Sequence, residues 1–265
     1  MAFRWAWTLL RCAGIIAFAT IVTREVRRFL RIWPQTLIPP VITIVLYFLI
    51  FGNLIGGRIG EMAGLPYIQF VAPGLIMMSV ITNSYSNVVS SFYGSKFQRN
   101  IEELLVSPTP NIVILLGYVV GGMTRGLGIG VIVTLLSLYF ADFSIHNVPV
   151  TISIVLLTSM LFSIAGLLNA IFADSFDDIS IVPTFILTPL TYLGGVFYST
   201  QLLSDFWANV ALINPILYVV NTFRYGFSGV TDINIWWSFA MVGLSITVLF
   251  SITLRQLEQG SRLRS

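Results

Sequence analysis

Cysteine and histidine are almost missing from this sequence. Cys12 is its one cysteine, so no disulfide can form within the chain. His146 is its one histidine, which excludes the clusters of histidine and cysteine that hold zinc and other transition metals. We therefore expect neither a metal site nor a cofactor in this chain.

Charged residues are scarce as well. They make up 9% of the 265 residues, against 56% that are hydrophobic, and the mean hydropathy is +0.89. A soluble domain of this length could not bury so much apolar surface. The composition predicts an all-α membrane protein, and the distribution of its basic residues predicts the orientation.

Apolar stretches predict six transmembrane helices within residues 35–254, after an N-terminal segment 1–34 and before a tail 255–265. The fifth is expected to be bent by Pro183 and Pro189. The other five expected spans are 35–54, 67–93, 113–140, 148–172 and 235–254.

Residues 200–232 fit neither a loop nor a span. They are too apolar for an aqueous loop, yet polar residues such as Asp205, Asn214 and Arg224 interrupt them repeatedly. Lipid tolerates interrupted backbone only where protein or water supplies hydrogen bonds. We expect a re-entrant helical hairpin in the outer leaflet. With six spans and cytosolic termini, Arg58 and Arg224 are the basic residues left outside, whereas a seventh span would export the C-terminal arginines.

The N-terminal segment predicts an interfacial helix from Thr23. Its apolar face is expected to carry Val26, Phe29, Leu30 and Trp33, with arginines on the other faces. Residues 17–19 imitate a signal-peptidase site, but cleavage there would leave four arginines at a translocated N-terminus, against the orientation rule.

Two polar features lie inside expected spans. The second span carries a stripe of hydrogen-bonding residues at three- and four-residue spacing: Ser79, Asn83, Ser86, Asn87 and Ser90. The stripe suits hydrogen bonds between helices or a wall of a transport pathway.

Arg125 lies near the middle of the third span, where it must face protein or water. Either an ion pair with a neighbouring carboxylate or a contact to an anionic head group would satisfy it.

The third span is rich in glycine. Three GxxxG pairs predict close approach of other helices: Gly117/Gly121, Gly122/Gly126 and Gly126/Gly130. Residues 126–130 do not follow a strand, so they are no nucleotide loop. The sequence also has no GxxxxGK[ST] motif, and any ATP hydrolysis must come from another chain.

Residues 94–110 predict an amphipathic helix between two spans, ended by Pro108 and Pro110. One face is apolar: Phe97, Ile101, Leu104 and Leu105. The other is charged: Lys96, Arg99, Glu102 and Glu103. Periodicity alone fits a solvated surface helix as well as a helix that contacts a partner.

A second turn carries Asp174, Asp177 and Asp178, which could cap a helix, bind a cation or meet a basic partner.

Three segments in order, 194–198 (GGVFY), 214–218 (NPILY) and 224–226 (RYG), resemble the C-terminal signature of the type-2 ABC exporter permeases, and the resemblance covers nearly the whole chain. It implies a bacterial inner-membrane subunit with cytosolic termini that works as two copies above two ABC ATPase subunits, which carry ATP and Mg. It also implies that the N-terminal helix touches the ATPase.

The resemblance further implies roles for individual residues. Those expected to couple the permease to the ATPase are Phe97, Arg99, Ile101, Glu102, Leu104, Leu105 and Pro108. Those expected to form the pathway or its outer gate are Asn83, Asn87, Arg125, Tyr198, Asn214, Tyr218 and Arg224.

Other functions fit the sequence less well. Residues 226–229 match the GxSG of rhomboid proteases, but no histidine follows Ser228 to activate it, so we expect no catalytic activity. An ion-coupled secondary transporter is the alternative; it would carry ionisable groups near the midplane, where this chain has Arg125 and no acid. We expect an amphipathic cargo, membrane lipids as partners and no nucleic acid.

Overall fold

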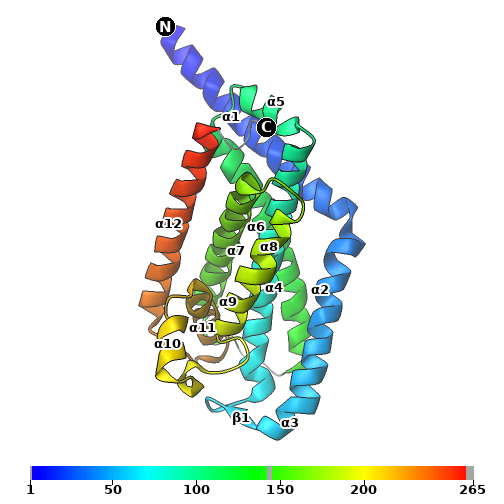
Figure 1. Cartoon of the computed structure of the whole chain (residues 1–265), viewed down its shortest axis with the longest axis vertical. Coiled ribbons are helices and arrows are strands. Elements are labelled where there is room, and N and C mark those ends of the chain that lie inside the picture. Colours follow the sequence, from blue (N-terminus) through cyan, green and yellow to red (C-terminus); the bar gives the residue numbers. More distant parts are fainter. Residues whose placement is uncertain (1, 142–144, 261–265) are drawn as a thin grey trace.

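Both termini lie at one end of a bundle of long helices, with the short helix α5 beside them (Figure 1). We name this the termini end, and the opposite end, with α3 and α10, the hairpin end. The computed structural model describes residues 2–141 and 145–260, except for the side chains of residues 2–13, 53 and 105. Its elements in order are α1 (Ala2–Arg31), α2 (Trp33–Tyr47), the π-helix η1 (Phe48–Ile55), α3 (Gly56–Ile59), β1 (Glu61–Met62), β2 (Leu65–Pro66), α4 (Tyr67–Phe97), α5 (Asn100–Val106), α6 (Asn111–Phe140), α7 (Val148–Phe172), α8 (Asp178–Ile181), the π-helix η2 (Val182–Leu187), α9 (Thr188–Leu193), the 3₁₀-helix η3 (Thr200–Leu202), α10 (Asp205–Ala211), α11 (Pro215–Ser228) and α12 (Ile235–Gln259).

Within the described ranges, four helical segments are long and apolar enough to cross a membrane: Trp33–Ile59, α6, α7 and α12. These segments establish an all-α, multi-pass protein. The expected second span, α4, is 31 residues long but less apolar. The expected fifth span, Asp178–Leu193, is shorter than the roughly 20 residues that a bilayer core requires. The count of six spans therefore stays a prediction.

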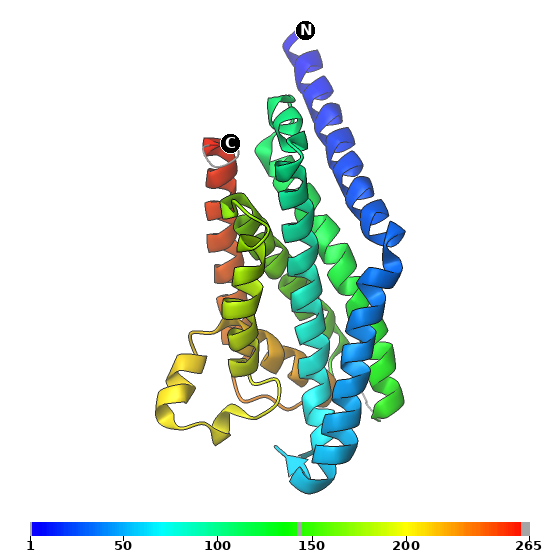
Figure 2. The ribbon, with the colours of Figure 1, turned by 45° about the vertical axis from the view of Figure 1, so that its right-hand side comes forward.

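Helix α4 is less apolar because protein rather than lipid surrounds it. It packs against α6, α7 and α11, and most of its residues are buried (Figure 2). Its polar stripe is therefore largely covered: Ser79, Asn83 and Asn87 are buried, and Ser90 at the termini end is exposed. A central helix can carry hydrogen-bonding groups that a lipid-facing helix could not.

The glycines of α6 bring two helices close on two sides. A Cβ atom added at Gly117 would meet Ile21 of α1 at 2.7 Å, and one at Gly121 would meet Glu25 at 2.5 Å. On the other side, a Cβ at Gly122 would meet the backbone oxygen of Ser84 at 3.0 Å. Helices α1 and α4 thus occupy the surfaces that the GxxxG pairs leave open, which confirms the predicted close approach.

The N-terminal helix differs from the prediction. Helix α1 starts at Ala2 rather than Thr23, and its buried positions are Ile21, Glu25 and Phe29, four residues apart. Of the predicted apolar face, Leu30 and Trp33 are more than half exposed. The side of α1 that packs on α6 is therefore centred on Ile21 and Glu25, and the interfacial face stays a prediction, because side chains that contact lipid are exposed on the protein itself.

Helices α10 and α11 lie where the hairpin is predicted and are bent by 87° to each other, which fits either a broken span or a re-entrant turn, so the re-entrant hairpin stays a prediction. The Asp232 carboxylate accepts hydrogen bonds from the Ser199 hydroxyl at 2.9 Å and from the backbone N–H of Thr200 at 3.0 Å. This contact joins the start of the segment to its end, so the chain leaves and returns at the hairpin end (Figure 1).

Candidate functional site

The connection between α4 and α6 is a tight turn followed by a seven-residue helix. Helix α4 ends at Phe97, and Arg99 takes the left-handed conformation with φ of 61° before α5 begins at Asn100. The single amphipathic helix predicted here is therefore wrong: Phe97 and Ile101 belong to different helices. Two consecutive residues, Gln98 and Arg99, leave helical geometry and reverse the chain, which periodicity could not reveal.

Among its described side chains, helix α5 buries Ile101 and exposes Asn100, Glu102, Glu103 and Val106. Ile101 is 1% exposed and anchors the helix, while Leu104 is half-buried. Glu102 and Glu103 point to solvent in the first turn, where acids favour the positive end of the helix dipole. Val106 is 87% exposed.

Of the other residues predicted to couple to an ATPase, Arg99 and Pro108 are exposed, and the Leu105 side chain lies outside the described residues. Phe97 is 65% exposed although it belongs to α4. The exposed members of the predicted coupling set are thus apolar and charged side chains around α5. Together with the exposed Glu103 and Val106 we name them the coupling ridge: Phe97, Arg99, Glu102, Glu103, Val106 and Pro108.

A buried lysine anchors the neighbouring turn. Lys96 of α4 is 8% exposed and donates to the carbonyl oxygens of Ile171 at 3.1 Å and Ala173 at 2.8 Å. A cation at a helix C-terminus satisfies open carbonyls and complements the helix dipole. Lys96 also lies 3.7 Å from Asp174, and the Tyr93 hydroxyl donates to the Asp174 carbonyl oxygen. Helices α4 and α7 are thereby joined at the termini end.

The acidic turn caps itself. The Asp178 carboxylate accepts hydrogen bonds from the backbone N–H groups of Asp174 at 3.0 Å and Ser175 at 2.9 Å. In return, the Ser175 hydroxyl accepts from the backbone N–H of Asp178 at 3.2 Å. The N–H of Asp174 is the main cause that lowers the pKa of Asp178. Of the three uses the sequence left open, the geometry of Asp178 favours capping.

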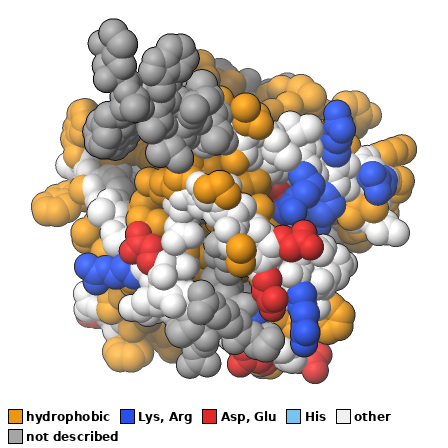
Figure 3. Space-filling model, turned by 90° about the horizontal axis from the view of Figure 1, so that it is seen from above, with side chains coloured by type: hydrophobic (Ala, Val, Ile, Leu, Met, Phe, Trp, Pro, Cys, Tyr) orange, Lys and Arg blue, Asp and Glu red, His pale blue; other side chains and the backbone are white. Residues whose placement is uncertain are grey.

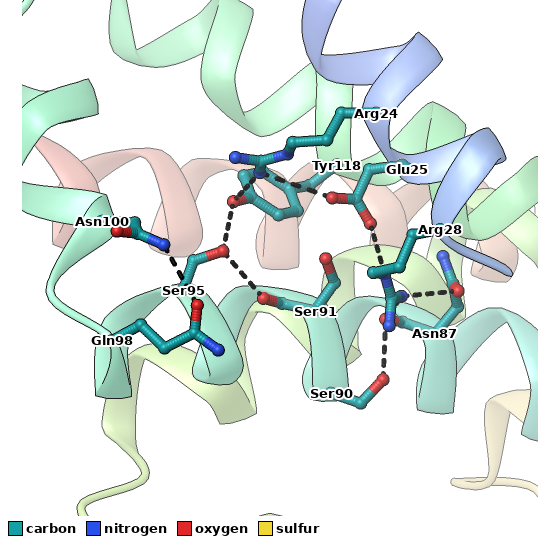
Figure 4. A network of polar contacts seen from close by, with 10 residues as sticks. All are labelled: Arg24, Glu25, Arg28, Asn87, Ser90, Ser91, Ser95, Gln98, Asn100 and Tyr118. Carbon is teal, nitrogen blue, oxygen red and sulfur yellow. Dashed lines mark hydrogen bonds and ion pairs between the residues drawn. The ribbon is translucent and has the colours of Figure 1, made fainter. Parts of the chain in front are cut away.

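A polar network joins α1, α4 and α6 (Figure 4). Glu25 is 1% exposed, and its two carboxylate oxygens each lie 3.4 Å from an arginine, Arg24 on one side and Arg28 on the other. Arg24 also donates to the Tyr118 hydroxyl, and Arg28 donates to the side-chain oxygen of Asn87 at 2.8 Å. The network holds the two arginines in place, and it gives the buried Glu25 carboxylate the paired cations that offset the cost of its burial.

Arg125 does not form the ion pair that the sequence favoured. No carboxylate in the described part of the chain lies within ion-pair distance of it; its guanidinium instead donates to the side-chain oxygen of Asn83 at 3.3 Å. Asn83 and Asn87 thus each accept from an arginine of another helix, which is the hydrogen-bonding role predicted for the stripe.

At the hairpin end, the NPILY residues hold the hairpin together. The Asn214 side chain accepts from the backbone N–H of Ile216 at 3.0 Å, which caps α11, and donates to the Leu190 carbonyl oxygen at 2.6 Å. Pro215 fits the first helical position, where no N–H is needed. The Tyr218 hydroxyl donates to the Leu212 carbonyl oxygen at 2.7 Å.

Arg224 is the largest fully buried side chain in the described structure. It donates from Nε to the Phe70 carbonyl oxygen at 3.2 Å and from a terminal nitrogen to the Gly195 carbonyl oxygen at 2.7 Å. Its guanidinium also lies 3.8 Å from the centre of the Phe70 ring. Tyr198, in the same loop as Gly195, is half-buried. The signature residues therefore fasten the hairpin and its loop to α4.

The GxSG segment shows no catalytic arrangement among the described residues. The Ser228 hydroxyl donates to the Arg224 carbonyl oxygen at 2.9 Å, as helical serines commonly do. Gly226 lies where a Cβ atom would collide with Thr151 of α7, so its role is close helix packing.

Sequence reasoning missed Glu25, Tyr118 and the anchoring role of Lys96. One signal was available for Glu25: it is a lone acid within a run of arginines. Nothing in the sequence indicated Tyr118 or the partners of Lys96, because these contacts join residues more than 70 positions apart.

These features define a membrane-embedded helical transport subunit, and comparison with known proteins identifies its class. Residues 16–228 match the family described as ABC-2 type transporter, and the chain belongs to that family. It is 56% identical over 250 residues to the inner membrane transport permease YadH of Escherichia coli K12, covering 94% of this chain and 98% of that protein. It is also 22% identical over 217 residues to nodulation protein J of Neorhizobium galegae, covering 80% and 81% of the two chains.

The chain is therefore a transmembrane permease of the ABC transporter type and a multi-pass protein of the inner membrane. The family implies an ABC ATPase as its partner. The resemblance drawn from residues 194–226 is confirmed.

Proposed function

We propose that this permease exports an amphipathic substrate, such as a lipid, a lipid-linked glycan or a hydrophobic drug, with energy from separate ATPase subunits. Two copies form the pathway at their interface, and two ATPases, carrying ATP and Mg, dock at the termini end, which faces the cytosol. The exposed ridge at α5 is the observation that carries the proposal.

The ridge suits a coupling role because it is anchored and exposed at the same time. Ile101 fixes α5 to the bundle, whereas Glu102, Glu103 and Val106 are presented to a partner. Phe97 also meets Phe176 edge to face, with ring centres 5.0 Å apart, and both are more than half exposed. A partner that pushes on this ridge moves the ends of α4 and α6 directly.

The pathway residues then act at two depths. Asn83, Asn87 and Arg125 line the junction of α4 and α6, where Arg125 is available to an anionic head group. At the outer gate, Asn214, Tyr218 and Arg224 hold the hairpin, and Tyr198 contributes to its loop. The hydrogen bonds of Asn214 to α9 and of Arg224 to α4 connect the hairpin to these two helices. In alternating access the hairpin therefore moves together with them.

The test begins with purification of the tagged full-length chain from its native membrane in mild detergent. We expect an ABC ATPase to be retained. The complex in proteoliposomes should then move a short-chain fluorescent phospholipid when ATP is added. A chain that purifies without an ATPase and transports when a proton gradient is applied would instead be an ion-coupled secondary transporter.

The coupling role is tested by Glu102→Ala, with Glu61→Ala as the matched control, since Glu61 is an exposed acid at the hairpin end. We expect Glu102→Ala to insert normally and to lose about tenfold of the ATP-driven transport, within the range typical of coupling between sites. Equal transport by the two variants would refute the coupling role of Glu102.

A further inference from the structure

A groove opens between α1 and the last turns of α4 at the termini end. Its volume is about 1010 Å³. In the view onto this end, basic side chains gather on one side with acidic ones beside them (Figure 3). The groove lies outside the coupling ridge and the hairpin, so neither role assigned above accounts for it.

One wall of the groove has a large excess of positive charge. Helix α1 contributes Arg24, Arg27, Arg28 and Arg31, and the one acid that lines the groove within the described structure is Glu25. Glu25 is already engaged, because Arg24 and Arg28 each lie 3.4 Å from its carboxylate. The groove therefore retains a net positive charge, and Arg27 and Arg31 are its arginines without a carboxylate partner.

Arg27 and Arg31 are the arginines left for a ligand. Both side chains are exposed, and no hydrogen bond or ion pair joins them to any described residue of the chain. The facing wall from α4, the turn after it and the start of α5 adds Ser90, Gln98 and Asn100, which carry neutral hydrogen-bonding groups. Arginine on one side and hydroxyl or amide groups on the other suit a phosphate group.

The groove is also amphipathic. Apolar residues of α1 and the bend after it line it too, and Ile16 and Ile32 are 66% and 38% exposed. A soluble phosphate would leave these side chains in water, whereas acyl chains would cover them. The combination points to a ligand with a phosphate head and a hydrocarbon tail.

We propose that this groove binds the phosphate head group of an anionic phospholipid from the adjacent leaflet. Arg27 and Arg31 contact the phosphate, and Ile32, at the bend that leads into α2, contacts the upper part of the acyl chains. The bound lipid fastens α1 to α4 at the helix ends that lead into the coupling ridge. The site depends on the membrane alone, so it stands whether or not the chain proves to be an exporter.

The test measures binding of phosphatidylglycerol to the purified full-length permease in detergent by native mass spectrometry. The variant is Arg27→Gln with Arg31→Gln, and the matched control is Arg58→Gln with Arg255→Gln, which removes the same charge from exposed positions outside the groove. We expect the groove variant to bind about thirtyfold more weakly than wild type, since each basic residue near an anionic lipid surface contributes about 1 kcal/mol. The control should bind like wild type.

Two further probes separate the sources of phosphate. Phosphatidylcholine, whose head group has no net charge, should bind more weakly than phosphatidylglycerol. Soluble glycerol 1-phosphate should not displace the bound lipid at equal concentration. Equal loss in both arginine pairs, or equal binding of the two lipids, would overturn the proposal; displacement by glycerol 1-phosphate would show a site for soluble phosphate instead.

If the groove variant unfolds at a lower temperature than the control, the wild type is titrated with salt: weaker lipid binding at high salt supports the proposal, and no change overturns it.

Discussion

Arg224 illustrates how this protein keeps a charged residue inside the bundle. Within the described structure it has no direct ion pair, yet two backbone carbonyl oxygens and the face of Phe70 surround its guanidinium. These carbonyls come from α4 and from the loop at Gly195, two segments that Arg224 therefore holds together. The residue was predicted as part of the gate, and its burial indicates that it would act by positioning the hairpin rather than by touching cargo.

We predict that Arg224→Leu destabilises the protein, because two buried carbonyl oxygens lose their donor. The expected cost is about 1–3 kcal/mol for each group left unpaired. Thermal unfolding of the purified permease measures it. Arg255→Leu is the control, since Arg255 is exposed at the end of α12 and should change stability by no more than about 0.5 kcal/mol. Equal unfolding temperatures for the two variants would contradict the assigned role.

At the scale of elements, the arrangement of α1, α4 and α6 depends on glycines. Gly117 and Gly121 make one face of α6 flat enough for α1, and Gly122 does the same for α4. Close backbone approach strengthens packing between helices in lipid, where hydrophobic burial cannot drive association. The same contact brings the Tyr118 hydroxyl of α6 within hydrogen-bond distance of Arg24 of α1, so this link of the polar network depends on the glycine surface.

We predict that Gly121→Leu forces α1 away from α6. A Cβ atom there would lie 2.5 Å from the Glu25 Cβ, a backbone-linked atom that cannot rotate aside, and overpacking of this kind costs about 1–3 kcal/mol. Gly128→Leu in the same helix is the control, because a Cβ atom at Gly128 meets nothing within 4 Å. The unfolding temperature of Gly121→Leu should fall below that of Gly128→Leu. The close packing would be refuted if both variants unfolded together.

At the scale of the whole molecule, the ends of the bundle differ in charge. The termini end carries the arginines of α1 together with Lys96, Arg99 and Arg255, whereas Arg58 is the exposed basic residue at the hairpin end of the described chain. Basic residues accumulate on the cytosolic side of inner-membrane proteins. This asymmetry predicts that α5 and both termini face the cytosol.

Labelling with a membrane-impermeant maleimide tests this orientation. Cys12→Ala removes the single native cysteine, after which Val106→Cys and Trp236→Cys each introduce one; the replaced side chains are 87% and 82% exposed and lie toward opposite ends. In spheroplasts we expect labelling of Trp236→Cys, and in inside-out vesicles labelling of Val106→Cys. Labelling of Val106→Cys in intact spheroplasts would reverse the orientation and remove the ridge from the reach of a cytosolic ATPase.

The sequence alone determined the class of fold, the break in the apolar pattern at residues 200–232 and the family. The fold class follows from the scarcity of charged residues and the long apolar stretches, and both are properties of the sequence. The polar residues that interrupt 200–232 can likewise be read directly from the sequence. The residues of the NPILY segment also carry local information, since an asparagine before a proline predicts a helix start, which α11 shows.

Tertiary structure alone decided which partners the charged residues have. Lys96 and Arg224 are each satisfied by groups distant in sequence, and Arg125 donates to the amide oxygen of Asn83 on another helix rather than to a carboxylate. The break at Arg99 is also decided there, because it depends on how α5 folds back onto α4. Composition and periodicity report which faces of a helix are apolar, whereas a buried charge needs a partner whose position exists only once the helices have packed.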